Sequence, residues 1–176
     1  MTDADRLQYP IGRFVRTAVP LDPADRDALI DDLARLPGEV RALVQGLSER
    51  DLETPYRPGG WTIRQVVHHL PDSHINAYVR MKLALTEEAP VVRVYMEERW
   101  TELPEAKSGP IAMSLELLDA LHRRWVALLR ALPASEFARP YVHPELGPVP
   151  IDVGLGLYAW HGRHHSAHIR AALDRA

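Results

Sequence analysis

The sequence predicts an all-α protein that folds as a four-helix bundle with long connections between its helices. Four long segments repeat apolar residues at the three- and four-residue spacing of a helix face, and no stretch shows the alternation of a strand. Four amphipathic helices in one chain bury their apolar faces most simply against one another. A length of 176 residues is that of one domain, so we expect a single domain over residues 1–176.

The N-terminal part of the chain is expected to hold an arm and one long helix. Residues 1–22 show no sustained periodicity and predict an extended arm. Residues 25–47 predict the first long helix, and Pro37 within it predicts a kink or a division, because proline lacks the backbone donor of a helix interior. Residues 48–60 contain several proline and glycine residues and predict a loop.

The second long helix is expected over residues 62–85. Thr62 and Gln65 have the spacing of a capping box, in which the side chain of each residue accepts a hydrogen bond from the backbone amide of the other. Pro71 lies inside this segment, and a kink is expected there.

The second half of the chain is expected to hold two more long helices. Residues 86–109 are mixed and charged, with one short helix expected near 95–103. Residues 110–132 predict the third long helix, 133–150 form a proline-rich connection, and 151–174 predict the last helix. Because the connection before the third helix is long for adjacent antiparallel helices, we do not expect a simple up-down-up-down order.

The composition excludes several classes of protein. The chain has no cysteine, which excludes a disulfide framework, thiolate metal ligands and a cysteine nucleophile. A formal charge of −3 lacks the basic excess of a nucleic-acid-binding protein. No stretch approaches the roughly 20 apolar residues that span a bilayer, and no signal-peptide pattern is present. We therefore expect a cytoplasmic protein with no nucleic acid or membrane partner.

Histidines are concentrated in the last predicted helix, at positions 161, 164, 165 and 168. On a helical projection the apolar residues of this segment centre at about 45° from His161, and His165 lies at about 40°. These two residues are therefore expected to point into the bundle, one helical turn apart, where two imidazoles can reach one ion. The metalloprotease motif HExxH is absent, since Gly162 follows His161, and the protease hypothesis is rejected.

A third ligand is expected from the second helix, because metal sites in bundles draw on facing helices. The projection places His68 on the outside, but it does not choose between His69 at the flank and His74 within the apolar sector. Ser73, Asn76 and Arg80 align with His69 to within about 40°, which favours His69. Three neutral imidazoles suit zinc or nickel and leave a coordination position open for water.

Several motifs occur in an order that resembles one family. They are YPIG at 9–12, YRPGGWT at 56–62, RQVVHHL at 64–70, DSH at 72–74, KLALTE at 82–87, LHRRW at 121–125 and LYAWHGRHH at 157–165. Together these motifs are similar to those of YfiT-type metal-dependent hydrolases of the DinB-like superfamily. One departure is Pro71, where alanine is more usual.

The resemblance implies a four-helix bundle that binds one divalent metal ion, Zn²⁺ or Ni²⁺, per chain. The metal ligands of the family fall on His69, His161 and His165 of this sequence. The resemblance also implies a cytoplasmic homodimer that acts on a small-molecule substrate. Related proteins of the superfamily transfer low-molecular-weight thiols such as bacillithiol or mycothiol.

Three functional hypotheses follow from these observations. The leading hypothesis is a hydrolase whose three-histidine metal site activates water. The second is a metal-dependent S-transferase, which would need a thiol cosubstrate because the chain has no thiol. The third is a non-catalytic binding or scaffold dimer, in which a fourth protein ligand closes the metal site. In an enzyme, Asn76, Arg80 and Tyr158 are candidates to face the substrate.

Overall fold

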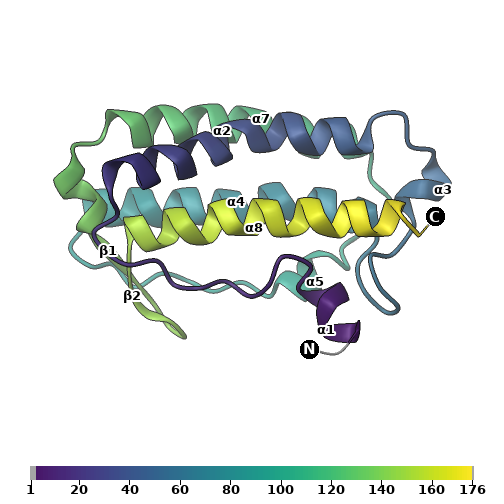
Figure 1. Cartoon of the computed structure of the whole chain (residues 1–176), viewed down its shortest axis with the longest axis horizontal. Helices are drawn as coiled ribbons and strands as arrows, with labels where there is room; N and C mark the ends of the chain where they lie inside the picture. Colours follow the sequence, from purple (N-terminus) through teal and green to yellow (C-terminus); the bar gives the residue numbers. More distant parts are fainter. Residues whose placement is uncertain (1–2, 176) are drawn as a thin grey trace.

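The computed structural model describes residues 3–175 as a bundle of four long helices (Figure 1). These are α2 (Pro23–Val44), α4 (Ile63–Thr86), α7 (Ile111–Ala131) and α8 (Ile151–Leu173). The predicted all-α four-helix bundle is therefore confirmed. Short helices occupy the connections: α1 (Asp3–Gln8), α3 (Glu49–Leu52), α5 (Glu97–Trp100), α6 (Pro104–Ser108) and the 3₁₀ helix η1 (Ala134–Ala138). None of the helices in this part of the chain is long and apolar enough to cross a membrane.

The order of the helices around the bundle is not the order along the chain. α2 packs against α7 and α8, α4 packs against the same two helices, and α2 and α4 lie diagonally opposite (Figure 1). α4 and α7 run parallel, because the connection 87–110 returns to the end where α4 begins (Figure 1). Near that end, His68 of α4 contacts Ser114 of α7. A simple up-down-up-down order is thus excluded, as the long connection predicted.

The two prolines within the predicted helices do not divide them. α2 continues through Pro37 and α4 continues through Pro71, and both prolines are buried. In α2, Leu33 before the proline and Val40 after it are both fully buried on the core side of the helix. Packing of one continuous apolar face therefore outweighs the local cost of the proline. Of the two expectations at Pro37, a kink or a division, the division is wrong.

The connection 133–150 contains a β-hairpin that the sequence analysis did not predict. β1 (Pro140–His143) pairs antiparallel with β2 (Gly147–Pro150), and Tyr141 lies opposite Val149. Both of these side chains are buried in the same cluster as the bundle core. Strands of four residues that include prolines are too short to show alternation, which is why they were missed.

The N-terminal arm runs along α8 in an extended conformation, as predicted, except that it begins with the short helix α1 (Figure 1). Gly156 of α8 makes this close approach possible. A Cβ atom at Gly156 would lie 2.7 Å from Cγ2 of Thr17 in the arm. The absence of a side chain at this position therefore lets the arm pack directly on the helix.

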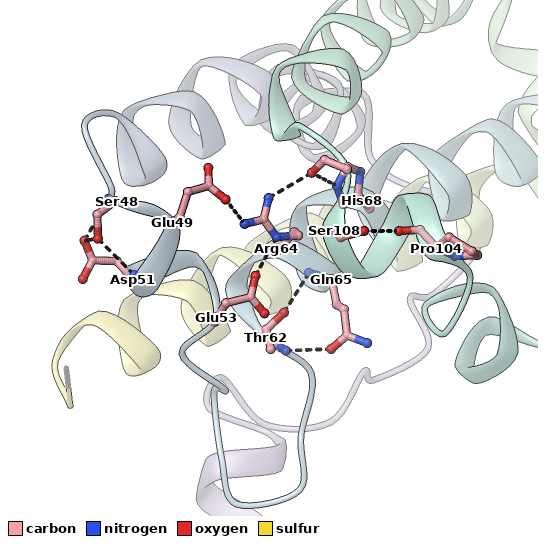
Figure 2. A network of polar contacts seen from close by, with 11 residues as sticks. Ser48, Glu49, Asp51, Glu53, Thr62, Arg64, Gln65, His68, Pro104 and Ser108 are labelled. Atoms are coloured by element: carbon pink, nitrogen blue, oxygen red, sulfur yellow. Dashed lines mark hydrogen bonds and ion pairs between the residues drawn. The ribbon is translucent and has the colours of Figure 1, made fainter.

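Hydrogen bonds at the start of α4 fix the position of this helix (Figure 2). Thr62 and Gln65 form the predicted capping box. The guanidinium of Arg64 is buried and binds the carboxylates of Glu49 and Glu53, and it also donates to the carbonyl of Gly109. Arg64 thus joins the segment around α3 and the end of α6 to the first turn of α4.

A buried ion pair fixes the relative position of α2 and α8. Nε and Nη2 of Arg26 lie 2.8 and 2.9 Å from the two carboxylate oxygens of Asp152. The two side chains are only 9% and 2% exposed. Asp152 also accepts a hydrogen bond from the backbone amide of Leu21. The first turns of the two parallel helices are therefore held side by side at the end of the arm.

Replacing Asp152 by alanine is expected to lower the free energy of unfolding by about 3–5 kcal/mol, because the change leaves Arg26 buried without its partner. The matched control is Asp119→Ala, which removes an exposed pair with Arg123 and is expected to change stability by less than about 1 kcal/mol. Urea denaturation of the three proteins measures both changes. Equal losses in the two variants would contradict this account of the buried pair.

Candidate metal centre

Three histidines from two helices converge on one point in the bundle. His69 comes from α4, and His161 and His165 come from α8. One ligand atom from each ring can be chosen so that all three atoms lie within 4.8 Å of one another. The Nε2 atoms of His69 and His161 are 3.2 Å apart. The structure thus brings together the three residues to which the family resemblance assigns a metal, and it leaves His74 outside this set.

The local sequence explains why these rings meet. His161 and His165 are four residues apart, so their side chains lie one turn apart on the same face of α8. α4 packs along α8, which places His69 against both of them. The indole of Trp61, just before α4, covers His69 and His165 with ring centroids 4.7 and 6.1 Å away. The aromatic ring thereby shields one side of the cluster from solvent.

The donor set fits a divalent transition metal. Two histidine nitrogens at the usual zinc distance of about 2.0–2.1 Å in a tetrahedral site are about 3.3 Å apart. The observed separation of 3.2 Å between His69 and His161 matches this value. Imidazole nitrogens are suited to zinc, nickel and copper, whereas calcium and magnesium prefer oxygen ligands.

Burial keeps the three rings in the form that binds metals. Desolvation lowers the pKa of His69 to about 4, and it holds the pKa values of His161 and His165 well below their ordinary value of 6.5. The neighbouring imidazoles act in the same direction, because a second positive charge would be repelled. All three residues are therefore neutral near pH 7, and a neutral imidazole has the lone pair that a metal requires.

Two neighbouring histidines lie outside the cluster. His68 was expected on the outer surface of the bundle, but it is buried. Its Nδ1 lies 2.7 Å from the Ser114 hydroxyl, and its Nε2 lies 3.2 Å from the Gly109 carbonyl. The helical projection failed because α6 and α7 cover this side of α4. His164 is also buried, and its ring stacks on Trp160 with centroids 4.5 Å apart.

The three residues expected to face a substrate have different surroundings. Tyr158 is buried beside the cluster, 5.5 Å from the His161 ring, and burial raises the pKa of its hydroxyl. Arg80 is buried and donates to the carbonyl of Arg93, and it forms no ion pair with any residue of the described part of the chain. Asn76 donates to the carbonyl of Asp72 one turn earlier in α4. Its amide is therefore used within its own helix.

Asp72 is a candidate functional residue that the sequence analysis did not identify. Burial and the nearby charge of Glu105 raise the pKa of its carboxyl to about 6. It follows His69 by three residues, a spacing that places two side chains next to each other on a helix surface. This spacing was visible in the sequence. The raised pKa comes first from burial and second from Glu105 in α6, and neither could be placed from the sequence.

Comparisons with known proteins agree with this description of the fold. Residues 32–169 match the model of the DinB superfamily. A relative from Bacillus cereus strain B4264 is 48% identical over 169 residues, covering 96% of each chain, and is provisionally named a metal-dependent hydrolase. A relative from Bacillus mycoides, 46% identical with the same coverage, has the same provisional name.

Two solved structures are similar to the chain. YfiT from Bacillus subtilis, described as a probable metal-dependent hydrolase with an unusual four-helix bundle topology, superposes with a TM-score of 0.93. It is 44% identical, and the match covers 97% of both chains. The four-helix bundle protein TT2238 has a TM-score of 0.56 and 20% identity over 86% of this chain and 99% of its own, which shows a shared fold alone.

The metal-free protein is expected to lose stability as the pH falls from about 6.5 to about 4. Below pH 6.5 the unfolded chain binds protons on histidines that the folded chain keeps neutral, so each such histidine lowers the free energy of unfolding by about 1.4 kcal/mol per pH unit. Asp72 acts in the opposite direction below about pH 6, because its pKa is raised in the folded state. Because several histidines act in one direction and Asp72 alone in the other, we expect a net loss in the free energy of unfolding.

Urea denaturation at pH 7.5, 6.0 and 5.0 measures this loss of stability. His164→Gln removes one buried histidine whose pKa is lowered to about 4, and it should reduce the dependence on pH. A free energy of unfolding that is the same at pH 7.5 and pH 5.0 would contradict the neutral state of the buried histidines.

Proposed function

This chain belongs to the DinB superfamily, and from its cluster of three histidines we propose that it is a metal-dependent hydrolase. The observation that carries the proposal is the convergence of His69, His161 and His165, with ligand atoms within 4.8 Å of one another. The provisional names of relatives that are 46–48% identical support the same activity. Three protein ligands leave room for water or substrate at the ion, which is typical of catalytic rather than structural sites.

We assign one divalent ion per chain to the three rings, with zinc or nickel as the metal. A divalent ion there supplies a Lewis acid, which polarises a scissile group and makes water more acidic. The protein contributes neutral ligands, the indole of Trp61 over one side of the cluster, and a largely buried setting that strengthens electrostatic interactions. The shielding of the cluster by Trp61 favours small substrates that enter from the other sides.

Three residues of α4 and α8 have the properties needed to bind and orient a substrate. Arg80 is a buried cation without an acidic partner in the described residues, so an anionic group of the substrate is its natural partner. Tyr158 is a hydrogen-bond donor at pH 7, because its pKa is raised. The carboxylate of Asp72 is ionised above about pH 6 and is suited to accept a proton from water near neutral pH.

Protein purified without a chelator is expected to contain about one zinc or nickel ion per chain. His69→Ala, His161→Ala and His165→Ala should each weaken metal binding by more than about 100-fold, since even outer residues of such sites contribute 10–100-fold. Isothermal titration with zinc measures the affinities. His164→Ala is the matched control, because His164 is a buried histidine of the same helix that lies outside the cluster. An equal loss in His164→Ala and His165→Ala would contradict the assignment.

Hydrolysis without an added thiol is the expected activity of the metal-loaded protein. Simple esters and amides with an anionic group should be cleaved, and both a chelator and His161→Ala should abolish the reaction. The same assay with a low-molecular-weight thiol and an electrophile tests the alternative. Product that forms only with the thiol would make the protein an S-transferase, and a fully ligated ion without turnover would favour a scaffold dimer.

A further inference from the structure

Behind the proposed metal ligand His161, two more histidines form a line across the bundle. Nδ1 of His161 lies 3.1 Å from Nε2 of His74, and Nδ1 of His74 lies 2.9 Å from Nε2 of His122. Nδ1 of His122 lies 2.6 Å from the backbone carbonyl oxygen of Leu33. These four residues come from α8, α4, α7 and α2, so that each long helix contributes one member.

The carbonyl at the end of the line determines the direction of every hydrogen bond in it. A carbonyl oxygen can only accept, so Nδ1 of His122 must carry the proton. A neutral imidazole has one N–H, which leaves Nε2 of His122 as an acceptor for a proton on Nδ1 of His74. By the same step Nδ1 of His161 donates to Nε2 of His74. The unprotonated nitrogen of His161 is then Nε2, the atom that faces His69.

Burial makes this order difficult to reverse. His74 and His122 are 0% and 1% exposed, and the side chain of Leu33 is fully buried. Desolvation lowers the pKa values of both histidines, so neither ring carries a second proton that would break the sequence of donors and acceptors. With the opposite direction, two lone pairs would face each other between His122 and Leu33 in a site that excludes water.

Pro37 explains why the carbonyl of Leu33 is free to accept. In an α-helix each amide donates to the carbonyl four residues earlier, and the residue four positions after Leu33 is Pro37. Proline has no amide hydrogen, so this carbonyl receives no such bond from its own helix. The hydrogen bond from His122 replaces the missing one.

We propose that His74 and His122 are positioning residues, which hold His161 with its proton on Nδ1 and direct the lone pair of Nε2 to the metal. The inference rests on the proposed metal site, but it predicts a property of the metal-free protein as well. Histidines that bind metals commonly donate their second nitrogen to a fixed acceptor. Here the acceptor is a backbone carbonyl that is reached through two intervening rings.

His165 has a shorter version of the same arrangement. Nε2 of His168 lies 3.1 Å from the carbonyl of Gln8, so Nδ1 of His168 is an acceptor. It faces Nδ1 of His165 at 3.4 Å, which is long for a hydrogen bond but has the matching direction. Two of the three proposed ligands are thus oriented by neighbouring histidines, and each series of hydrogen bonds ends at a backbone carbonyl.

The first test is the tautomer of each histidine in the metal-free wild-type protein. ¹⁵N NMR of selectively labelled histidines at pH 7.5 distinguishes a proton on Nδ1 from one on Nε2. The expected result is Nδ1–H for His161, His74 and His122. A proton on Nε2 of His161 would overturn the proposal. Because this measurement needs no metal, it tests the line of histidines even if the protein fails to bind a metal, which would overturn only the proposed function.

The second test compares variants that keep His161 itself. His122→Leu removes the acceptor of His74, so we expect a fraction of His161 with its proton on Nε2 and metal affinity reduced by about 10–100-fold. His122→Gln keeps one acceptor and one donor and is expected to restore most of the affinity. His68→Leu is the matched control, since it also replaces a buried histidine that makes two hydrogen bonds, away from this line.

Zinc titrations and the ¹⁵N spectra of the three folded variants give the answer. Weaker binding in His122→Leu, with the affinity retained in His68→Leu, supports the proposal. Equal affinities in His122→Leu and the wild type, with His161 unchanged in the spectrum, would overturn it. An equal loss in His122→Leu and His68→Leu would also overturn it, because the effect would then reflect general loss of packing.

Discussion

The buried imidazoles of this bundle have to stay uncharged, and this requirement governs how its four long helices pack. Seven histidines are buried among the described residues: His68, His69, His74, His122, His164, His165 and His168. A charged imidazole is costly to remove from water, so these rings are neutral. Each neutral ring then presents one donor and one acceptor, and the helices must be rotated and staggered so that most of these groups meet a partner.

The unusual order of the helices supplies these partners. Because α4 and α8 are neighbours, the three rings of the candidate metal centre come from two adjacent helices. α2 and α7 lie on the other side, where they provide the Leu33 carbonyl and His122 that support His161 through His74. The buried pair of Arg26 and Asp152 keeps α2 and α8 in register. The helix that carries the Leu33 carbonyl is therefore fixed relative to the helix that carries His161 and His165.

Much of the fold was predictable from the sequence, because apolar spacing reports directly on helices. Residues 62–85 predicted α4 to within one residue at each end, and Thr62 predicted its cap. The hairpin at 140–150 was not predictable, since its strands are short and rich in proline. His68 was misplaced because a projection of one helix does not show that α6 and α7 pack against that side of it.

The candidate site, like the fold, was predictable from the sequence only in part. His161 and His165 could be paired from their spacing alone, because both lie on one helix. The choice of His69 over His74 needed the family resemblance, and the geometry brings His69 to the cluster. The contact of His74 with His122 joins residues 48 positions apart, and no local pattern reports such a contact. To predict this contact, one must know how α4 and α7 are rotated relative to each other.

Pro37 shows how a local cost in one helix can serve a distant site. A proline inside a helix costs about 3 kcal/mol relative to alanine, in part because it leaves a carbonyl without its donor. A buried carbonyl without a partner would add about 1–3 kcal/mol. The hydrogen bond from His122 removes this second cost, and it gives His122 an acceptor that cannot rotate or titrate. A flexible side chain in this place could donate as well as accept, and the direction of the bonds that reach His161 would then be undetermined.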